Sequence, residues 1–151
     1  MFSDKKFAPE DFVRTAWHIE RDIMGEAVGS QDQVFAVYGN MLHITFGPGD
    51  TFKVNHIDAP FHLPKYLYLI PVGRFRTASD VARIQIERTP YLKSQLMDMR
   101  SFVSHGLNVL SSQYFDASEL GRLLKETWRI KRSLTNVVTT DEIDSIFSKV
   151  D

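Results

Sequence analysis

Apolar residues recur at helical spacing near the start of the chain. They begin after Pro9, a residue well suited to a first helical position, and they stop before Gly25. The stripe consists of Phe12, Ala16, Ile19 and Ile23. The pattern therefore predicts a helix that carries Glu20 on the flank of its apolar face.

A second, shorter helix is predicted for Gln33 to Tyr38. Asp32 lies near its N-terminus, where an acidic side chain is favourable, and Gly39 provides an end signal. The glycine-rich stretch before Asp32 then becomes the turn between two helices, so Glu20 and Asp32 stand on either side of a chain reversal.

A hairpin is predicted after these helices. Residues Leu42–Phe46 and Thr51–Ile57 alternate between apolar and polar side chains, as half-buried strands do. Gly47-Pro48-Gly49-Asp50 connects them, and proline followed by Gly-Asp favours a reversal. We therefore expect two antiparallel strands joined at this turn.

Prolines interrupt the chain at Pro60 and Pro64, which makes this the best boundary between two subdomains. The continuous apolar run from Tyr66 to Val72 then ends at Gly73. Such a run is typical of a buried central strand, with Pro71 placed at its end.

Four helices are predicted beyond this strand. Ser79 can cap the first of them, which extends to about Arg88. The second carries the apolar stripe Leu96, Met99, Val103, Leu107 and Leu110. The third and fourth begin at the capping-box patterns Asp116-x-x-Glu119 and Thr139-x-x-Glu142.

Together these elements predict an α+β fold. We expect the remnant of a two-layer α/β sandwich, with a small antiparallel sheet and a helix-rich C-terminal half. One domain would cover residues 1–60 and a second would cover residues 61–151. A chain of 151 residues is long enough to bury a core.

The amino-acid composition indicates which binding partners and which cell compartment to expect for this protein. The net charge of -1 gives no basis for binding nucleic acid through bulk electrostatics. The five histidines show no metal-ligand spacing, and the absence of cysteine fits a reducing compartment. No apolar run approaches the roughly 20 residues of a membrane span, and no signal peptide is recognised. We therefore expect a cytoplasmic protein without nucleic-acid or membrane partners.

Three segments, in order along the chain, carry a family resemblance. The first runs from His18 to Gly25 and continues in Gly29 to Gln33; the second is Gly73 to Ser79; the third runs from Leu120 to Asp144. Together they resemble the GHMP kinases, the family of galactokinase, homoserine kinase and mevalonate kinase. The most similar branch is that of the heptose-phosphate kinases of bacterial surface-sugar synthesis.

The resemblance implies ATP-dependent phosphorylation of a sugar or sugar phosphate, with ATP and Mg²⁺ as cofactors. Family members also carry a Pro-x-x-x-Gly-Leu-Gly-Ser-Ser phosphate loop upstream and a Gly-Gly-rich loop downstream. Neither loop occurs in this sequence. Because a triphosphate needs a ring of backbone N–H donors, we expect a partial kinase that does not turn over ATP alone.

By resemblance, Asp32 is the catalytic base that orients or deprotonates the acceptor hydroxyl. The structural alternative is that Asp32 only caps its helix. Ser30, Gln31 and Gln33 lie in the same turn and are candidates for binding sugar hydroxyls. They could equally satisfy the exposed backbone groups at the helix end.

Three further residues complete the expected site. Glu20 lies in a Glu-Arg-x-Ile-x-Gly context that supplies a Mg²⁺ ligand in parts of the family, so it is expected to bind the metal and with it the cofactor. The alternative is a solvated carboxylate paired with Arg21 or with a residue one turn away. Arg76 and Ser79 are expected to bind substrate, and Arg76 matches phosphate geometry, although a surface ion pair would explain it too.

Two other interpretations stay open. The chain could be a non-catalytic remnant that binds a sugar phosphate or a partner chain, or a helical interaction module unrelated to kinases. An unpaired strand at Tyr66–Val72 would expose an apolar edge, and such edges pair with other chains. The sequence therefore also predicts a homodimer or a complementing partner chain.

Overall fold

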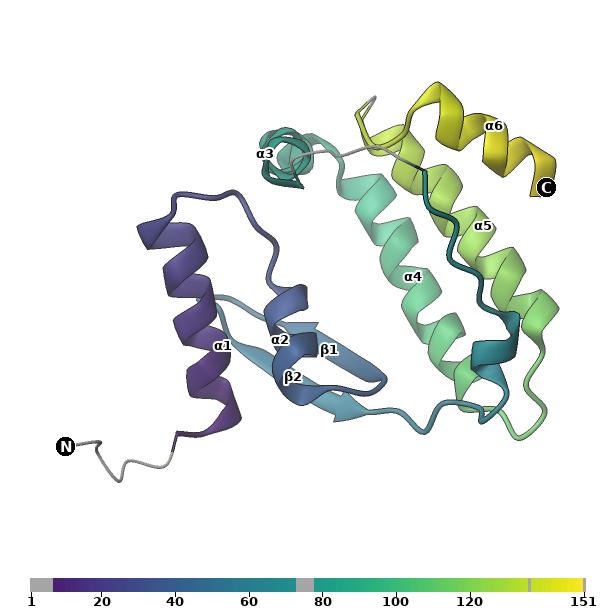
Figure 1. The fold of residues 1–151 in the computed structure, drawn as a ribbon, viewed down its shortest axis with the longest axis horizontal. Coiled ribbons are helices and arrows are strands. Elements are labelled where there is room, and N and C mark those ends of the chain that lie inside the picture. The colour runs from purple at the N-terminus through teal and green to yellow at the C-terminus, as the bar shows by residue number, and fades with distance from the viewer. Residues whose placement is uncertain (1–6, 73–77, 136, 151) are drawn as a thin grey trace. The chain divides into compact units, whose positions relative to one another are not determined.

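The computed structural model describes residues 7–72, 78–135 and 137–150 (Figure 1). The chain divides into two compact units, residues 1–57 and 58–151. The described residues form six α-helices and one two-stranded antiparallel sheet, which confirms the expected α+β class. No helix in these ranges is both long enough and apolar enough to cross a membrane.

The first unit contains three helical segments and the hairpin. They are α1 (Pro9–Trp17), the π-helical turn η1 (His18–Ile23), α2 (Gln31–Tyr38), β1 (Leu42–Phe46) and β2 (Phe52–His56). The register runs from Leu42 opposite His56 to Phe46 opposite Phe52. The predicted helices and the predicted hairpin are therefore confirmed.

The hairpin turn follows its expected chemistry. The Gly47 N–H donates to the Thr51 carbonyl oxygen at 2.8 Å, and the Thr51 hydroxyl donates to the Pro48 carbonyl oxygen at 2.8 Å. Gly49 and Asp50 have φ values of 63° and 56°, in the left-handed region that glycine and aspartate tolerate best.

A small core joins α1, α2 and the sheet. Val13 and Val34 are fully buried, and Trp17 and Leu42 are nearly so. The Trp17 and Phe52 rings pack edge to face with centroids 5.5 Å apart. The core therefore centres on the indole of Trp17.

The prediction of which apolar residues of α1 are buried is wrong. Phe12 and Ile23 are 56% and 68% exposed, and Val13 and Trp17 are buried instead. Both sets are spaced helically, so periodicity alone does not choose between them. The bulky indole buries more apolar area than the alternative residues and finds hydrogen-bond acceptors for its N–H, which explains the face that is buried.

The second unit is helical in its described residues. It contains α3 (Ala78–Arg88), α4 (Lys93–Leu110), α5 (Ala117–Leu134) and α6 (Asp141–Val150), with two short 3₁₀ turns, η2 (Leu63–Tyr66) and η3 (Thr89–Tyr91). Helices α4 and α5 lie side by side (Figure 1). A Cβ atom at Gly106 would lie 3.4 Å from Leu123 Cδ2, an ordinary van der Waals contact between the two helices.

The helix starts agree only in part with the predicted caps. Asp116 Oδ1 accepts hydrogen bonds from the N–H groups of Ser118 and Glu119, which confirms the start of α5. At α6 the expected cap is wrong by one residue, because Thr140 Oγ1 accepts the Ile143 N–H at 3.3 Å. Thr139 instead donates to Asp144 at 2.7 Å.

The prediction of a central strand at Tyr66–Val72 is also wrong. Residues 67–72 form no helix or strand, and Leu69 is 98% exposed. A strand needs neighbouring backbone groups for its N–H and C=O, and β1 and β2 are the strands among the described residues. The homodimer expectation depended on this strand, so it remains a prediction without that support.

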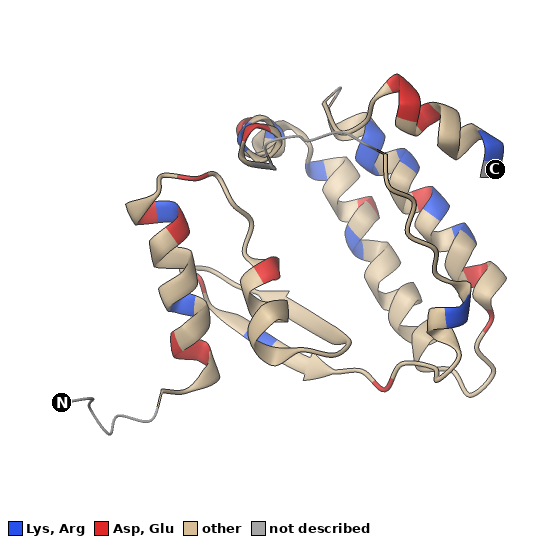
Figure 2. Cartoon of the chain, viewed as in Figure 1, with Lys and Arg blue, Asp and Glu red and all other residues tan. Residues whose placement is uncertain are grey.

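Acidic and basic side chains are mixed along α5 (Figure 2). Glu119 contacts Arg122 at 2.6 Å, and it also contacts His105 of α4 at 2.8 Å. The Arg122 guanidinium, which hydrogen-bonds the carboxylate, holds the pKa of Glu119 below its usual value. Glu119 therefore links α4 to α5 while it is ionised.

This lowered pKa gives the Glu119→Gln variant a pH-dependent effect. The pKa of Glu119 is lower in the folded chain than in the unfolded chain, so its ionised carboxylate stabilises the fold at pH values above the unfolded-state pKa. This stabilisation is lost as pH falls through the folded-state pKa. We expect a small loss of thermal stability at pH 6 that diminishes as pH falls through the lowered pKa of Glu119. Thermal unfolding by circular dichroism measures it, with Glu126→Gln as the control because Glu126 pairs with Arg129 on the same helix. Equal pH dependence in both variants would contradict the assignment.

Candidate functional site

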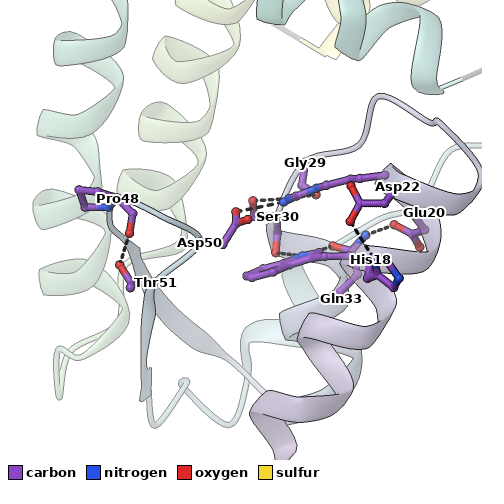
Figure 3. A network of polar contacts seen from close by, with 11 residues as sticks. His18, Glu20, Asp22, Gly29, Ser30, Gln33, Pro48, Asp50 and Thr51 are labelled. Carbon is purple, nitrogen blue, oxygen red and sulfur yellow. Dashed lines mark hydrogen bonds and ion pairs between the residues drawn. The ribbon is translucent and has the colours of Figure 1, made fainter.

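Figure 3 shows a network of polar contacts that includes Glu20, Ser30 and Gln33. The Trp17 indole is part of this network. The Trp17 Nε1–H donates to the Ser30 carbonyl oxygen at 3.2 Å and to Gln33 Oε1 at 3.1 Å. The amide of Gln33, which is itself buried, donates to the Glu20 carboxylate. These contacts join the end of α1 and η1 to the start of α2. Together with the contacts of Arg21, they form what we call the Trp17 network.

Arg21 extends the Trp17 network to the hairpin turn. Its Nη1 donates to Asp50 Oδ1 at 3.0 Å, and its Nη2 donates to Ser30 Oγ at 2.7 Å and to the Gly29 carbonyl oxygen at 3.2 Å. The guanidinium carbon lies 5.0 Å from the Trp17 ring centroid, within cation–π range. One side chain therefore contacts three segments of the chain.

The local sequence explains this placement. Trp17 and Arg21 are four residues apart, so they lie on one face where α1 continues into η1. The helix widens there to π-helical bonding, with Met24 N–H donating to Ile19 O at 2.9 Å. Gly25, with φ of 69°, then lets the chain leave the helix through the left-handed region.

A small pocket of about 160 Å³ lies against this network. It is lined by Arg14, Trp17, His18, Arg21, Asp22 and Asp50. His18 Nδ1 contacts Asp22 Oδ2 at 2.7 Å, and Arg21 is paired with Asp50, so charges of both signs meet on its walls. The pocket therefore favours neither an anion nor a cation.

The structure brings together some of the expected site residues and not others. Glu20, Ser30 and Gln33 belong to the Trp17 network. Gln31 and Asp32 occupy the first turn of α2 but are exposed, and they line neither this pocket nor the larger apolar groove between α4 and α5. Ser79 is the second residue of α3 in the other unit rather than its cap, and Arg76 lies outside the described residues.

Asp32 and Glu20 could each have a purely structural role, Asp32 as a helix cap and Glu20 as an ion-pair partner of Arg21. Ser30 occupies the N-cap position of α2, and Asp32 makes no hydrogen bond or ion pair with another described residue. Glu20 contacts Gln33 and does not pair with Arg21. Neither alternative, a capping Asp32 or a Glu20–Arg21 pair, is the observed arrangement.

Glu20 fits a metal role only as a single ligand. No group of three or more His, Cys, Asp and Glu side chains among the described residues could hold a metal ion. Mg²⁺ in nucleotide sites is typically bound by one or two carboxylates together with substrate phosphates and water. Glu20 has one carboxylate oxygen on Gln33, so it could supply one ligand to Mg²⁺ that arrives with a nucleotide.

Sequence reasoning missed three residues of the Trp17 network: Trp17, Arg21 as its central donor, and Asp50. The spacing of Trp17 and Arg21 was a usable signal, because an aromatic ring and an arginine four residues apart on a helix can stack. Asp50 gave no such signal, since 29 residues separate it from Arg21.

Comparisons with known proteins found no relative of this chain. No protein-family model, no curated protein and no solved structure matches this chain. The resemblance to GHMP kinases therefore rests on the residues of the sequence itself.

The buried amide of Gln33 makes a direct test of the Trp17 network. In a Gln33→Glu variant a second carboxylate faces Glu20, and we expect a loss of about 1–3 kcal/mol in the free energy of unfolding at pH 7. The loss should shrink as pH falls towards 4, because protonation of one carboxylate removes the repulsion. Urea unfolding at both pH values measures it.

The matched control is Gln31→Glu, two positions away on the exposed side of the same turn. Its stability should change by less than about 0.5 kcal/mol. If the two variants were equally stable at pH 7, the contacts assigned to Gln33 would be wrong.

Proposed function

We propose that this chain contributes the acceptor side of an ATP-dependent phosphoryl-transfer site of the GHMP kinase type, acting on a sugar or sugar phosphate. Asp32 is the proposed base for the acceptor hydroxyl. The observation that supports this role is its position. Asp32 is exposed in the first turn of α2, without a described partner, directly after a turn held by Trp17 and Arg21.

The position suits a carboxylate that accepts a proton. Unpaired N–H groups and the helix dipole at the start of α2 favour a negative side chain there. During transfer the acceptor oxygen would form a bond to the γ-phosphorus and lose its proton to Asp32. The bond between the γ-phosphorus and the bridging oxygen would break, and ADP would leave with the electron pair.

Other residues take supporting roles in this proposal. Mg²⁺, when bound, neutralises the phosphate charge, and Glu20 is the proposed protein ligand for it. Gln31 is exposed beside Asp32 and could bond a sugar hydroxyl, whereas Ser30 and Gln33 are held in the Trp17 network. Arg76 and Ser79 remain candidates for a substrate phosphate, by resemblance alone.

The alternative is binding without transfer. A specific feature favours it, because the 151 residues contain no phosphate loop of the family type. The use of ATP and the absence of cysteine fit a cytoplasmic site of action, which we propose for either function.

An Asp32→Asn variant tests the proposal. We expect the wild-type chain to bind heptose or hexose phosphates, and we expect the variant to bind them about tenfold more weakly, because the acceptor hydroxyl loses a charged partner. Titration calorimetry measures both affinities. A coupled ADP-release assay in the presence of Mg²⁺ should show no kinase-like turnover by the 151 residues alone.

The control is Asp22→Asn, which removes an exposed carboxylate that pairs with His18. Absence of sugar-phosphate binding, or equal binding by wild type and Asp32→Asn, would reject the proposed site. ADP release by the wild type that Asp32→Asn abolishes would support the kinase and reject the expectation that the chain is inactive alone.

A further inference from the structure

We infer that Arg21 is a positioning residue: it holds the turn that carries Asp32, and Asp50 of the hairpin turn holds Arg21. The inference rests on the proposed function for its consequence in substrate binding. The positioning itself is argued from contacts within the first unit.

The turn before Asp32 needs external support. Gly25 and Gly29 lie in the segment between η1 and α2, and glycine gives the backbone wide conformational freedom. The first backbone N–H groups of α2 have no partner within the helix. Contacts from Arg21 to Gly29 O and Ser30 Oγ therefore restrict the two residues that lead into α2.

The geometry of these contacts requires a guanidinium. Two different nitrogens of Arg21 bind on different sides, Nη1 on Asp50 and Nη2 on the Ser30 and Gly29 oxygens. The flat group also lies over the Trp17 ring. A lysine ammonium lacks the planar fork and could not reproduce all of these contacts at once.

The hairpin turn brings Asp50 to this guanidinium. Asp50 adopts a φ of 56°, in the left-handed region that aspartate tolerates better than most residues. The side chain of Arg21 is 25% exposed and that of Asp50 is 56% exposed, so the pair is shielded from solvent on the Arg21 side only.

A second ion pair on the same helix serves for comparison. Arg14 contacts Glu10 at 2.6 Å, four residues apart on α1, and both side chains are well exposed. This pair does not reach the turn before α2. Removing it should therefore leave that turn unchanged.

The chain carries its own reporters for the test. It has two tryptophans, and the indole N–H of Trp17 bonds directly to the turn, whereas Trp128 lies in the other unit. In ¹⁵N-labelled full chain, we expect Arg21→Gln to speed hydrogen exchange of the Trp17 indole by about tenfold, as the loss of one charged hydrogen bond would. Arg21→Lys should give an intermediate rate, and Arg14→Gln should give the wild-type rate.

The Trp128 indole should exchange at the wild-type rate in every variant. Titration with a heptose or hexose phosphate should show weaker binding by Arg21→Gln than by Arg14→Gln. Asp50→Asn keeps an oxygen at the same position and provides a second, milder test, with a smaller increase in Trp17 exchange.

An unchanged Trp17 rate in Arg21→Gln would overturn the inference. So would an equal acceleration in Arg14→Gln, or an acceleration of Trp17 and Trp128 together, because either result means general destabilisation. If Trp17 responds as expected while no sugar phosphate binds any form, the positioning of the turn stands and the proposed function fails.

Discussion

The buried indole N–H of Trp17 sets the arrangement of the first unit. A buried donor that lacks an acceptor costs free energy, so acceptors for this N–H stabilise the fold. The N–H meets two, the Ser30 carbonyl oxygen and Gln33 Oε1, and both belong to the start of α2. Satisfying one donor therefore fixes where the second helix begins and leaves the next exposed side chains, including Asp32, at a defined place.

The carboxylates around this network have different environments. Glu20 accepts a hydrogen bond from Gln33, and Asp50 pairs with Arg21. Asp32 is exposed and has no partner among the described residues. A group that must accept a proton from a substrate needs access to it and cannot be occupied by a neighbour. This difference leaves Asp32 available for the role of base that we propose for it.

Local chemistry made much of the fold predictable. Pro9 and Gly25 bracket the first helix, and the Gly-Pro-Gly-Asp turn joins the two strands as expected. What failed depended on contacts between distant segments: which face of α1 is buried, and whether the run Tyr66–Val72 finds a strand partner. The same distinction between nearby and distant segments applies to the residues of the candidate site. Glu20, Ser30 and Gln33 were named from one segment as ligand-binding candidates and share the contacts of the Trp17 network, whereas the Arg21–Asp50 pair joins residues 29 positions apart.

We propose that the start of α2 presents Asp32 to a bound alcohol. Chemical-shift mapping of the ¹⁵N-labelled chain during titration with a heptose or hexose phosphate tests it most directly. We expect the largest saturable shifts at the backbone amides of Ser30 to Gln33, with smaller shifts at the Trp17 indole. Shifts confined to other segments, or no saturable shifts at millimolar ligand, would contradict it.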